Sequence, residues 1–391
     1  MTAAEDPVAR ARELVPLVRE NADEAERARR LPQPVADAMA LAGLHRMAAP
    51  RSVGGGECEP TTQIAAIEEI SAADGASGWN LMIGIENQGF LGAVLPLETA
   101  RKLFADPALI VAGALNPLGR ARPDGGGLLV SGQWPFASGC HNAGWFWGQC
   151  VLMDGDEPAR NEAGGAALRE VLIPKSDFEI LDTWHVSGLR GSGSHDVCVH
   201  DVFIPDEYVT AVFSPGMRLR ETGTLYRFPP FNRLAYNKVG VATGIARAAI
   251  DHFVDLAAQK FRRGSGKPLR EKVSVQLAVA EAEARLRSAR AFVFDAVGEV
   301  WSVTEAGRES TPSQRALVHL ACSTACTASI EAVEIVHAAA GTTANFTASP
   351  LERCLRDVRV VPQHIMVSPQ WNEVAGRILL GLEGESPFSN G

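Results

Sequence analysis

The sequence has few aromatic residues, no excess of basic residues and no long apolar run. Its 391 residues include 6% aromatic residues and carry a formal net charge of −9 at pH 7. An acidic balance disfavours nucleic acid and anionic membrane surfaces as partners, because both bind to a basic face. No run of about 18 apolar residues is present, so no transmembrane helix is expected. The first residues lack the apolar core of a secretory signal. We therefore expect a cytoplasmic protein that binds neither nucleic acid nor a membrane.

Cysteine usage argues against a framework of disulfides. The seven cysteines are odd in number and scattered along the chain, which is typical of a reduced intracellular protein. Cys322 and Cys326 lie one helical turn apart, but no further Cys or His completes a zinc site at the usual spacing. Both are interpreted as small buried side chains, and no metal is expected.

Three regions of different character follow one another, and a chain of this length predicts two or three domains. Apolar residues recur at helical spacing through residues 1–108, and short β-like runs follow in residues 109–210. Residues 211–232 hold several Pro and Gly and are interpreted as a connection that could cover a substrate as a lid. Residues 233–391 contain four long helical patterns, the last over Pro350–Leu380, which predict a four-helix bundle. The expected fold class is α+β, mostly α: a helical domain, a β-barrel or sandwich, and a bundle.

One stretch, Ser131–Trp147, concentrates unusual residues. It holds three of the seven tryptophans, together with Pro135 and Gly139, which a strand interior tolerates poorly. Aromatic faces, a hydroxyl and a flexible backbone suit the binding of a flat, partly polar ring. The pattern alone fits equally well a bulged pair of strands that packs its aromatic residues into a core.

A glycine-rich run at Gly188–Gly193 does not predict a dinucleotide site. Such a site requires a strand, then the glycines, then a helix. Residues 197–204 instead alternate like a strand directly after the glycines.

Four spaced motifs follow one another along the chain: GQWPFASG at 132–139, WHVSGLRGSGS at 184–194, VFIP at 202–205 and SPLERCLRD at 349–357. In residues and in order they resemble motifs of the acyl-CoA dehydrogenase superfamily, and the likeness covers nearly the whole chain. Within the superfamily the chain is most similar to the two-component flavin-dependent monooxygenases, such as the hydroxyphenylacetate, secosteroid-phenol and dibenzothiophene oxygenases. The resemblance implies an N-terminal helical domain, a central β domain and a C-terminal four-helix bundle.

The same resemblance implies a flavin, FAD or FMN, at the junction of the β domain and the bundle. Phe136, Ala137 and Ser138 match the strand that lies along the edge of the isoalloxazine ring, and Trp184 matches the second segment beside it. Ser138 is expected to hydrogen-bond the flavin near N5. The bundles are expected to pack together in a homotetramer.

A basic loop, KFRRGSGKPL at 260–269, is similar to the family loop that contacts the flavin pyrophosphate of a neighbouring subunit. Arg262 or Arg263 would then bind the phosphate, since a guanidinium matches phosphate geometry. An exposed basic turn is the alternative.

The position of a catalytic base separates a dehydrogenase from an oxygenase. A dehydrogenase of this superfamily needs a carboxylate to remove the proton next to a thioester carbonyl. The two places where the family carries it, around Val361–Met366 and Phe231–Asn237, hold no acid here. The first holds His364, as in the resembling oxygenases, where a histidine can deprotonate a phenol or relay a proton around a flavin hydroperoxide. A histidine hydrogen-bonded between bundle helices is the alternative for His364.

Two further residues are candidates for a catalytic role. The resembling phenol hydroxylases often carry a histidine on the helix where this chain has Ile83–Gly89, so Glu86 or Asn87 occupies that place. A capping or solvated acid is the alternative for Glu86. His141 directly follows the stretch that matches the flavin edge.

Three hypotheses follow from these residues. The favoured one is a monooxygenase that takes reduced FMN or FAD from a separate reductase, forms a C4a-hydroperoxide with O2, and oxygenates a small apolar or aromatic substrate. The second is an FAD-dependent acyl-CoA dehydrogenase-like oxidoreductase with a displaced base, for which Glu86 is the best candidate. The third is a non-catalytic flavin-binding scaffold.

Overall fold

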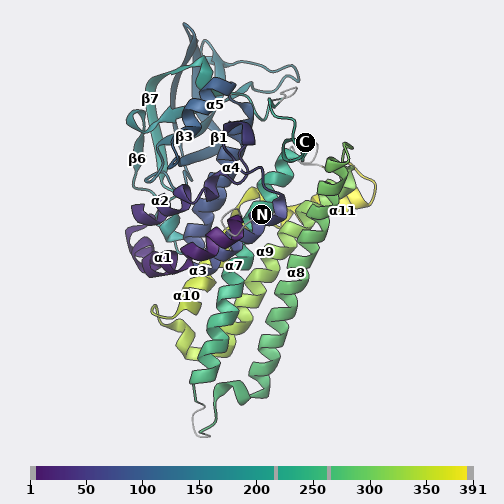
Figure 1. Cartoon of the computed structure of the whole chain (residues 1–391). Coiled ribbons are helices and arrows are strands. Elements are labelled where there is room, and N and C mark those ends of the chain that lie inside the picture. Colours follow the sequence, from purple (N-terminus) through teal and green to yellow (C-terminus); the bar gives the residue numbers. More distant parts are fainter. Residues whose placement is uncertain (1–5, 215–218, 262–265, 385–391) are drawn as a thin grey trace.

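The computed structural model describes residues 6–214, 219–261 and 266–384. In Figure 1 a sheet and a set of long helices lie at opposite ends of the molecule, with the first helices between them. These first helices are α1 (Pro7–Ala28), α2 (Gln33–Leu41), α3 (Pro60–Ala73) and α4 (Gly75–Val94), and the short α5 (Leu97–Phe104) lies beside the sheet. Asp74 caps α4 by accepting hydrogen bonds from the backbone N–H and the hydroxyl of Ser77. The cap fixes the start of the helix that contributes most to the site described below.

A mixed sheet follows α5. Its strands are β1 (Val111–Asp124), β2 (Gly127–Trp134), β3 (Trp145–Asp154), β4 (Glu157–Pro158), β5 (Leu168–Pro174), β6 (Glu179–Leu181), β7 (Asp196–Pro205) and β8 (Val209–Thr210). Their order is β6-β7-β2-β1-β3-β5-β8, with β4 paired to β3 and with β1 and β3 parallel. Neighbouring residues of β3 face opposite sides: Phe146 packs with the other strands, whereas Trp147 packs with Phe90 of α4. The β-barrel or sandwich expected in residues 109–210 is thus one continuous sheet with a core on each face.

Long helices make up the C-terminal part. They are α7 (Pro230–Gln259), α8 (Val273–Glu305) and α9 (Pro312–Ala340), preceded by the short α6 (Thr224–Arg227) and followed by α10 (Pro350–Val360) and α11 (Gln370–Leu379). The prediction of one helix over Pro350–Leu380 is wrong, because two short 3-10 turns, Val361–Gln363 and Ile365–Val367, separate α10 from α11. Pro362 and Pro369 lack the N–H that a continuous helix requires. Between the two turns His364 has an extended backbone, with φ −72° and ψ 130°.

The N-terminal helices and the bundle share one hydrophobic core. Its buried side chains come from α1 to α4 and from α6 to α11. Two glycines of α7 bring that helix against α3: a Cβ on Gly240 would lie 2.8 Å from the backbone oxygen of Ile64, and one on Gly244 would lie 2.6 Å from that of Glu68. This close approach positions α7 beside the α3–α4 pair, so a site between α4 and α7 is supported on both sides by packed core.

Residues 312–345, which include α9, are long and apolar enough to cross a membrane by length and composition, contrary to the expectation that no such stretch exists. Of the most apolar window, 67% is buried inside the protein. A central helix of a packed bundle has the same composition, so the stretch is weak evidence for a membrane span.

Candidate active site

The stretch Ser131–Trp147 divides between core and surface. Trp134 is fully buried and donates from Nε1 to the backbone oxygen of Gln149 at 2.7 Å. Phe136, two residues later, is 65% exposed and has a left-handed φ of 63°. Its ring meets Trp184 edge to face, with centroids 6.2 Å apart. Both interpretations of this stretch therefore apply: its tryptophans pack into cores, and the turn after β2 presents an aromatic ring outward.

Ser138 lies at the centre of a buried chain of hydroxyl groups. Its Oγ accepts a hydrogen bond of 3.0 Å from Trp79 Nε1, and it lies 2.7 Å from Ser194 Oγ. Ser194 Oγ in turn lies 2.7 Å from Ser192 Oγ. Because an indole N–H only donates, Ser138 keeps its own proton for Ser194 or for a bound group. The hydroxyls come from the turn after β2 and from the 3-10 turn at Arg190–Ser192 with the two residues after it, and the indole comes from α4.

The surroundings of Ser138 fit a flat ring with a polar edge. Phe136 and Trp184 offer aromatic surface on one side. Asn80 is buried, and neither its amide oxygen nor its amide nitrogen has a hydrogen-bond partner in the part of the chain described. Its amide would lie 3.5 Å from a Cβ on Gly139, a residue with φ 75°. A buried amide without partners is costly, and a polar ligand edge beside Gly139 would satisfy it.

Ala137, between Phe136 and Ser138, serves to hold the turn. Its side chain is fully buried, and its backbone N–H donates to the backbone oxygen of His195 at 3.0 Å. His195 Nδ1 accepts from the backbone N–H groups of Thr183 and Trp184, each at 3.2 Å. The two segments that were matched to the flavin edge are therefore tied together through His195.

His364 also contacts Trp79. The two rings have centroids 6.0 Å apart at an angle of 59°. His364 Nδ1 accepts from the backbone N–H of Met366 at 3.2 Å, which leaves the ring proton on Nε2. Burial, and then the charge of Lys238, holds the pKa of His364 well below its usual value. His364 is therefore neutral at physiological pH and has an N–H to donate.

Glu86 forms a buried ion pair with a lysine from α7. Lys238 Nζ lies 2.9 Å from each carboxylate oxygen of Glu86 and 2.8 Å from the backbone oxygen of Leu234. Burial raises the pKa of the Glu86 carboxyl, and the nearby Lys238 charge opposes that rise. Because both of its oxygens are occupied by the ammonium group, Glu86 is poorly placed to act as a free base.

His141 does not join the group around Trp79 in these contacts. Its ring packs edge to face on His195, with centroids 5.0 Å apart. Burial, followed by the neighbouring His195, lowers the pKa of His141 to about 4. Arg262 and Arg263 lie outside the described residues.

Three contributors were not singled out from the sequence: Trp79, Ser194 and Lys238. Trp79 lies five residues after Asp74, the residue that caps α4, so the helix start was a usable signal. Ser194 ends the glycine-rich motif, in which the glycines are the more conspicuous residues. Lys238 directly follows the Phe231–Asn237 segment, which contains no acid.

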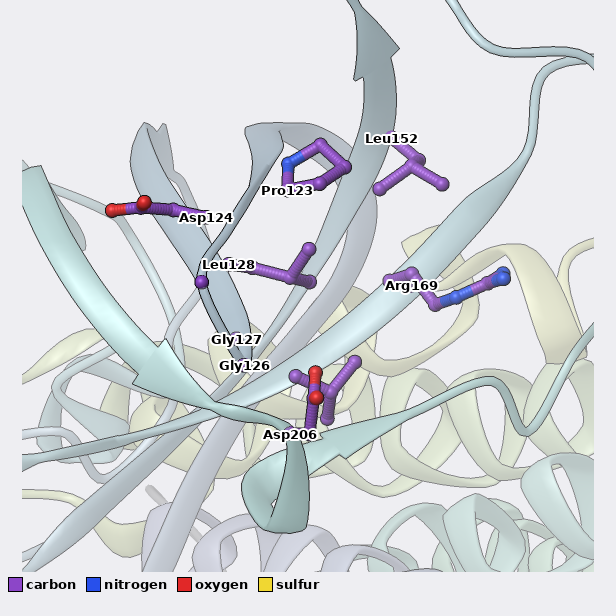
Figure 2. A pocket seen from close by; sticks show the side chains of 10 residues that line it. Pro123, Asp124, Gly126, Gly127, Leu128, Leu152, Arg169 and Asp206 are labelled. Atoms are coloured by element: carbon purple, nitrogen blue, oxygen red, sulfur yellow. The ribbon is translucent and has the colours of Figure 1, made fainter.

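A shallow hollow occurs at the β1–β2 hairpin, at the end of β2 away from Ser138 (Figure 2). It is lined by the β1–β2 hairpin with Asp124 and Gly126, and by Arg169 and Asp206. Figure 2 labels Arg169 together with the acidic residues Asp124 and Asp206, and none of the residues around Ser138 line the hollow.

Comparison with known proteins identifies the family of this chain. Residues 9–96 match the acyl-CoA dehydrogenase N-terminal domain, and residues 237–369 match the acyl-CoA dehydrogenase C-terminal domain. An indole-3-acetate monooxygenase of Pseudomonas putida is 31% identical over 92% of this chain and 89% of its own length. The oxygenase component of a FADH2-dependent resorcinol hydroxylase from Rhizobium is 30% identical over 95% and 93% of the two chains.

Solved structures agree with these relatives. The crystal structure of 3-HSA hydroxylase from Rhodococcus superposes with a TM-score of 0.87, at 25% identity and over 98% of both chains. The expected fold and the expected resemblance are confirmed. The chain belongs to the acyl-CoA dehydrogenase superfamily and, within it, to the flavin-dependent monooxygenases.

Proposed function

We propose that this protein inserts one oxygen atom of O2 into a small aromatic substrate held between α4 and the break before α11. The observation that carries the proposal is the convergence of Ser138, Trp79 and His364 on one another from three separate segments. The relatives named for indole-3-acetate and resorcinol support an aromatic ring as the substrate.

The residues of this chain divide the work by position. Phe136, Trp184 and the amide of Asn80 would hold the flavin ring, with Ser138 donating to its edge. A bound reduced flavin supplies the electrons that activate O2. Trp79 orients the Ser138 hydroxyl, and His364, whose ring contacts Trp79, holds a proton on Nε2.

The dehydrogenase alternative is disfavoured by the state of Glu86. Its two oxygens are held by Lys238 within a buried pair, so a proton abstraction by this carboxylate would first have to break that pair. The scaffold alternative is disfavoured by the relatives, since proteins that match nearly the whole chain are named as a monooxygenase and as the oxygenase component of a hydroxylase.

A second protein and further copies of the chain complete the proposal. A relative called an oxygenase component supports a separate flavin reductase that supplies the reduced flavin. A homotetramer is supported by exposed apolar side chains on α7, α8 and the turn between them. These are Val254, Phe261, Val273 and Leu277. We also place the protein in the cytoplasm, where its seven unpaired cysteines would remain reduced.

The test is transfer of an oxygen atom from O2. Purified protein with chemically reduced FMN or FAD is mixed with indole or resorcinol under ¹⁸O2, and the product is analysed by mass spectrometry. We expect one ¹⁸O atom per product. Products that carry oxygen from water, or bleaching of the oxidised flavin by an acyl-CoA without O2, would refute the proposal. The Ser138→Ala variant serves as the control for a reaction of free reduced flavin in solution.

A further inference from the structure

Arg233 is a buried cation that pairs with no carboxylate among the described residues. It lies in the first turn of α7 and is 3% exposed. It takes part in no ion pair within the described residues, and its Nη1 has no hydrogen-bond partner there. Tyr236, which is its hydrogen-bonding neighbour, is neutral because burial raises the pKa of the phenol well above its usual value. A buried guanidinium in this state is rare, because removing it from water is costly unless an anion compensates.

The nearest carboxylate is already committed elsewhere. Glu86 acts on both Arg233 and Lys238, but both of its oxygens lie 2.9 Å from Lys238 Nζ. The buried group therefore contains two cations and one anion, since His364 is neutral. It has one positive charge in excess, and Arg233 is the member with a free donor.

The surroundings of Arg233 are aromatic. Its guanidinium carbon lies 4.3 Å from the ring centroid of Phe90 and 5.5 Å from that of Tyr226. Phe90 continues into a cluster with Trp147 and Phe213. Cation–π contacts offset only part of the free energy that it costs to remove a guanidinium from water. The aromatic rings thus leave the excess charge largely uncompensated.

A second unpartnered polar atom lies on the same face of α7. Asn237 follows Arg233 by four residues, so the two side chains lie one turn apart. Asn237 is buried and its Oδ1 has no hydrogen-bond partner in the part of the chain described. An amide can present its nitrogen in place of its oxygen by rotation about the Cβ–Cγ bond, so this side chain can also donate to an anion.

Arg233 and His364 both lie near the Glu86–Lys238 ion pair. The charge of Glu86 acts on Arg233, and the charge of Lys238 acts on His364. A short aromatic acid with its carboxylate on Arg233 would therefore bring its ring into the neighbourhood of His364.

We propose that Arg233 is the substrate-anchoring residue and that the substrates are aryl carboxylates of the arylacetate type, bound by charge-assisted hydrogen bonds from Arg233 with support from Asn237. This inference rests on the proposed oxygenation of an aromatic ring and names the class of substrate. The name of the indole-3-acetate monooxygenase relative is consistent with it.

The experiment compares indole-3-acetate with indole-3-acetamide, which has the same shape without the charge. With wild-type protein we expect kcat/KM for the acid to exceed that for the amide by about 100-fold, the scale of a buried charge-assisted contact. Arg233→Met should remove this preference by lowering the value for the acid alone. Arg233→Lys keeps the charge but lacks the paired N–H donors of a guanidinium, so it should recover part of the preference for the acid.

Arg247→Met is the matched control. Arg247 lies on the same helix but pairs with Asp251 and Glu283 at the surface, so its loss should leave the acid-to-amide ratio unchanged. Equal treatment of acid and amide by the wild type, or an equal loss for both in Arg233→Met, would overturn the proposal. Weaker binding of reduced flavin in Arg233→Met, with the preference for the acid intact, would assign the charge to the anionic flavin and likewise overturn it.

A binding measurement separates this inference from the oxygenation itself. Calorimetric titration of the flavin-free protein with the acid and with the amide reports on Arg233 whether or not any product forms. If indole-3-acetate binds through Arg233 but no aromatic compound is oxygenated, the proposed function fails and the anchoring site stands. If indole is oxygenated and the acid binds no better than the amide, the anchoring site fails alone.

Discussion

Trp79 Nε1 donates to Ser138 Oγ across 3.0 Å and joins α4 to the turn after β2, two segments that are 59 residues apart in the chain. Trp79 also faces His364. One indole therefore sets the orientation of the hydroxyl that would face the flavin and contacts the histidine that carries a proton.

The first prediction removes only the indole donor. In Trp79→Phe the ring contact with His364 remains, while Ser138 is free to turn toward Ser194. We expect the share of turnovers that release H2O2 in place of product to rise by about tenfold, as for loss of one orienting hydrogen bond of about 1.4 kcal/mol. The H2O2-to-product ratio measures it. Trp301→Phe, on α8, should not change the ratio, and a similar ratio in both variants would contradict this role.

The second prediction concerns the protonation of His364. Burial and the Lys238 charge lower the pKa of His364, so the neutral ring is present throughout the range above that lowered pKa. Replacing the ion pair by the neutral pair Glu86→Gln with Lys238→Met removes the charge. The pKa of His364 should then rise, and the acidic limb of kcat/KM should move to higher pH. His364→Gln in the same background should abolish the limb. A pH profile of the double variant that matches the wild type would exclude this coupling.

The third prediction uses Asp357, which is buried and accepts from the backbone N–H of Leu189 at 2.6 Å. Burial raises the pKa of its carboxyl to about 7. A raised carboxyl pKa means that the folded state holds a proton which the unfolded state releases. Its contribution to stability is therefore present below pH 4 and lost as pH rises toward 7, by at most about 4 kcal/mol. Asp357→Asn keeps the acceptor and cannot ionise.

Asp357→Asn should thus be more stable relative to the wild type at pH 8 than at pH 5. Urea unfolding midpoints at the two pH values measure the difference. The exposed Asp255→Asn is the control and should show none. Loss of stability in Asp357→Asn that is equal at both pH values would show that the carboxylate is ionised in the folded protein.

The fourth prediction concerns His45, which is buried with both ring nitrogens unpartnered in the described part of the chain. Burial, with the nearby Arg46, lowers its pKa to about 4. A lowered histidine pKa means that the unfolded state binds the proton first, so stability falls as pH drops below about 6.5. At pH 5 the loss is about 2 kcal/mol. His45→Leu should reduce the difference in urea midpoint between pH 7.5 and pH 5, whereas the exposed His200→Leu should not.

Much of the fold could be anticipated from local patterns. Helical spacing, the change of character at Leu109 and the four motifs predicted the order of helices, strands and bundle. The break at Pro362 was missed because Pro350–Leu380 has apolar residues at helical spacing on both sides of the prolines. A pattern that resumes in phase conceals an interruption, although each proline forbids a continuous helix.

The site was predictable only where a motif named its residues. Ser138, Phe136 and Trp184 belong to motifs and lie together in the structure. Lys238 and Arg233 could not be assigned a role in this way. The role of a cation on an apolar helix depends on whether a carboxylate from another part of the chain pairs with it in the folded protein. Glu86 is 152 residues from Lys238, and no local pattern records that pairing.

The glycines that seat α7 against α3 have a further consequence for how such enzymes diversify. The side chains of α3, α4 and α7 pack in one core. Recombination that joins the N-terminal helices of one relative to the bundle of another would therefore disrupt the contact of α7 with α3 and α4. The chain should therefore be inherited as one unit. New substrate preferences should arise by single substitutions on the face of α7 that packs against the N-terminal helices, such as at position 233.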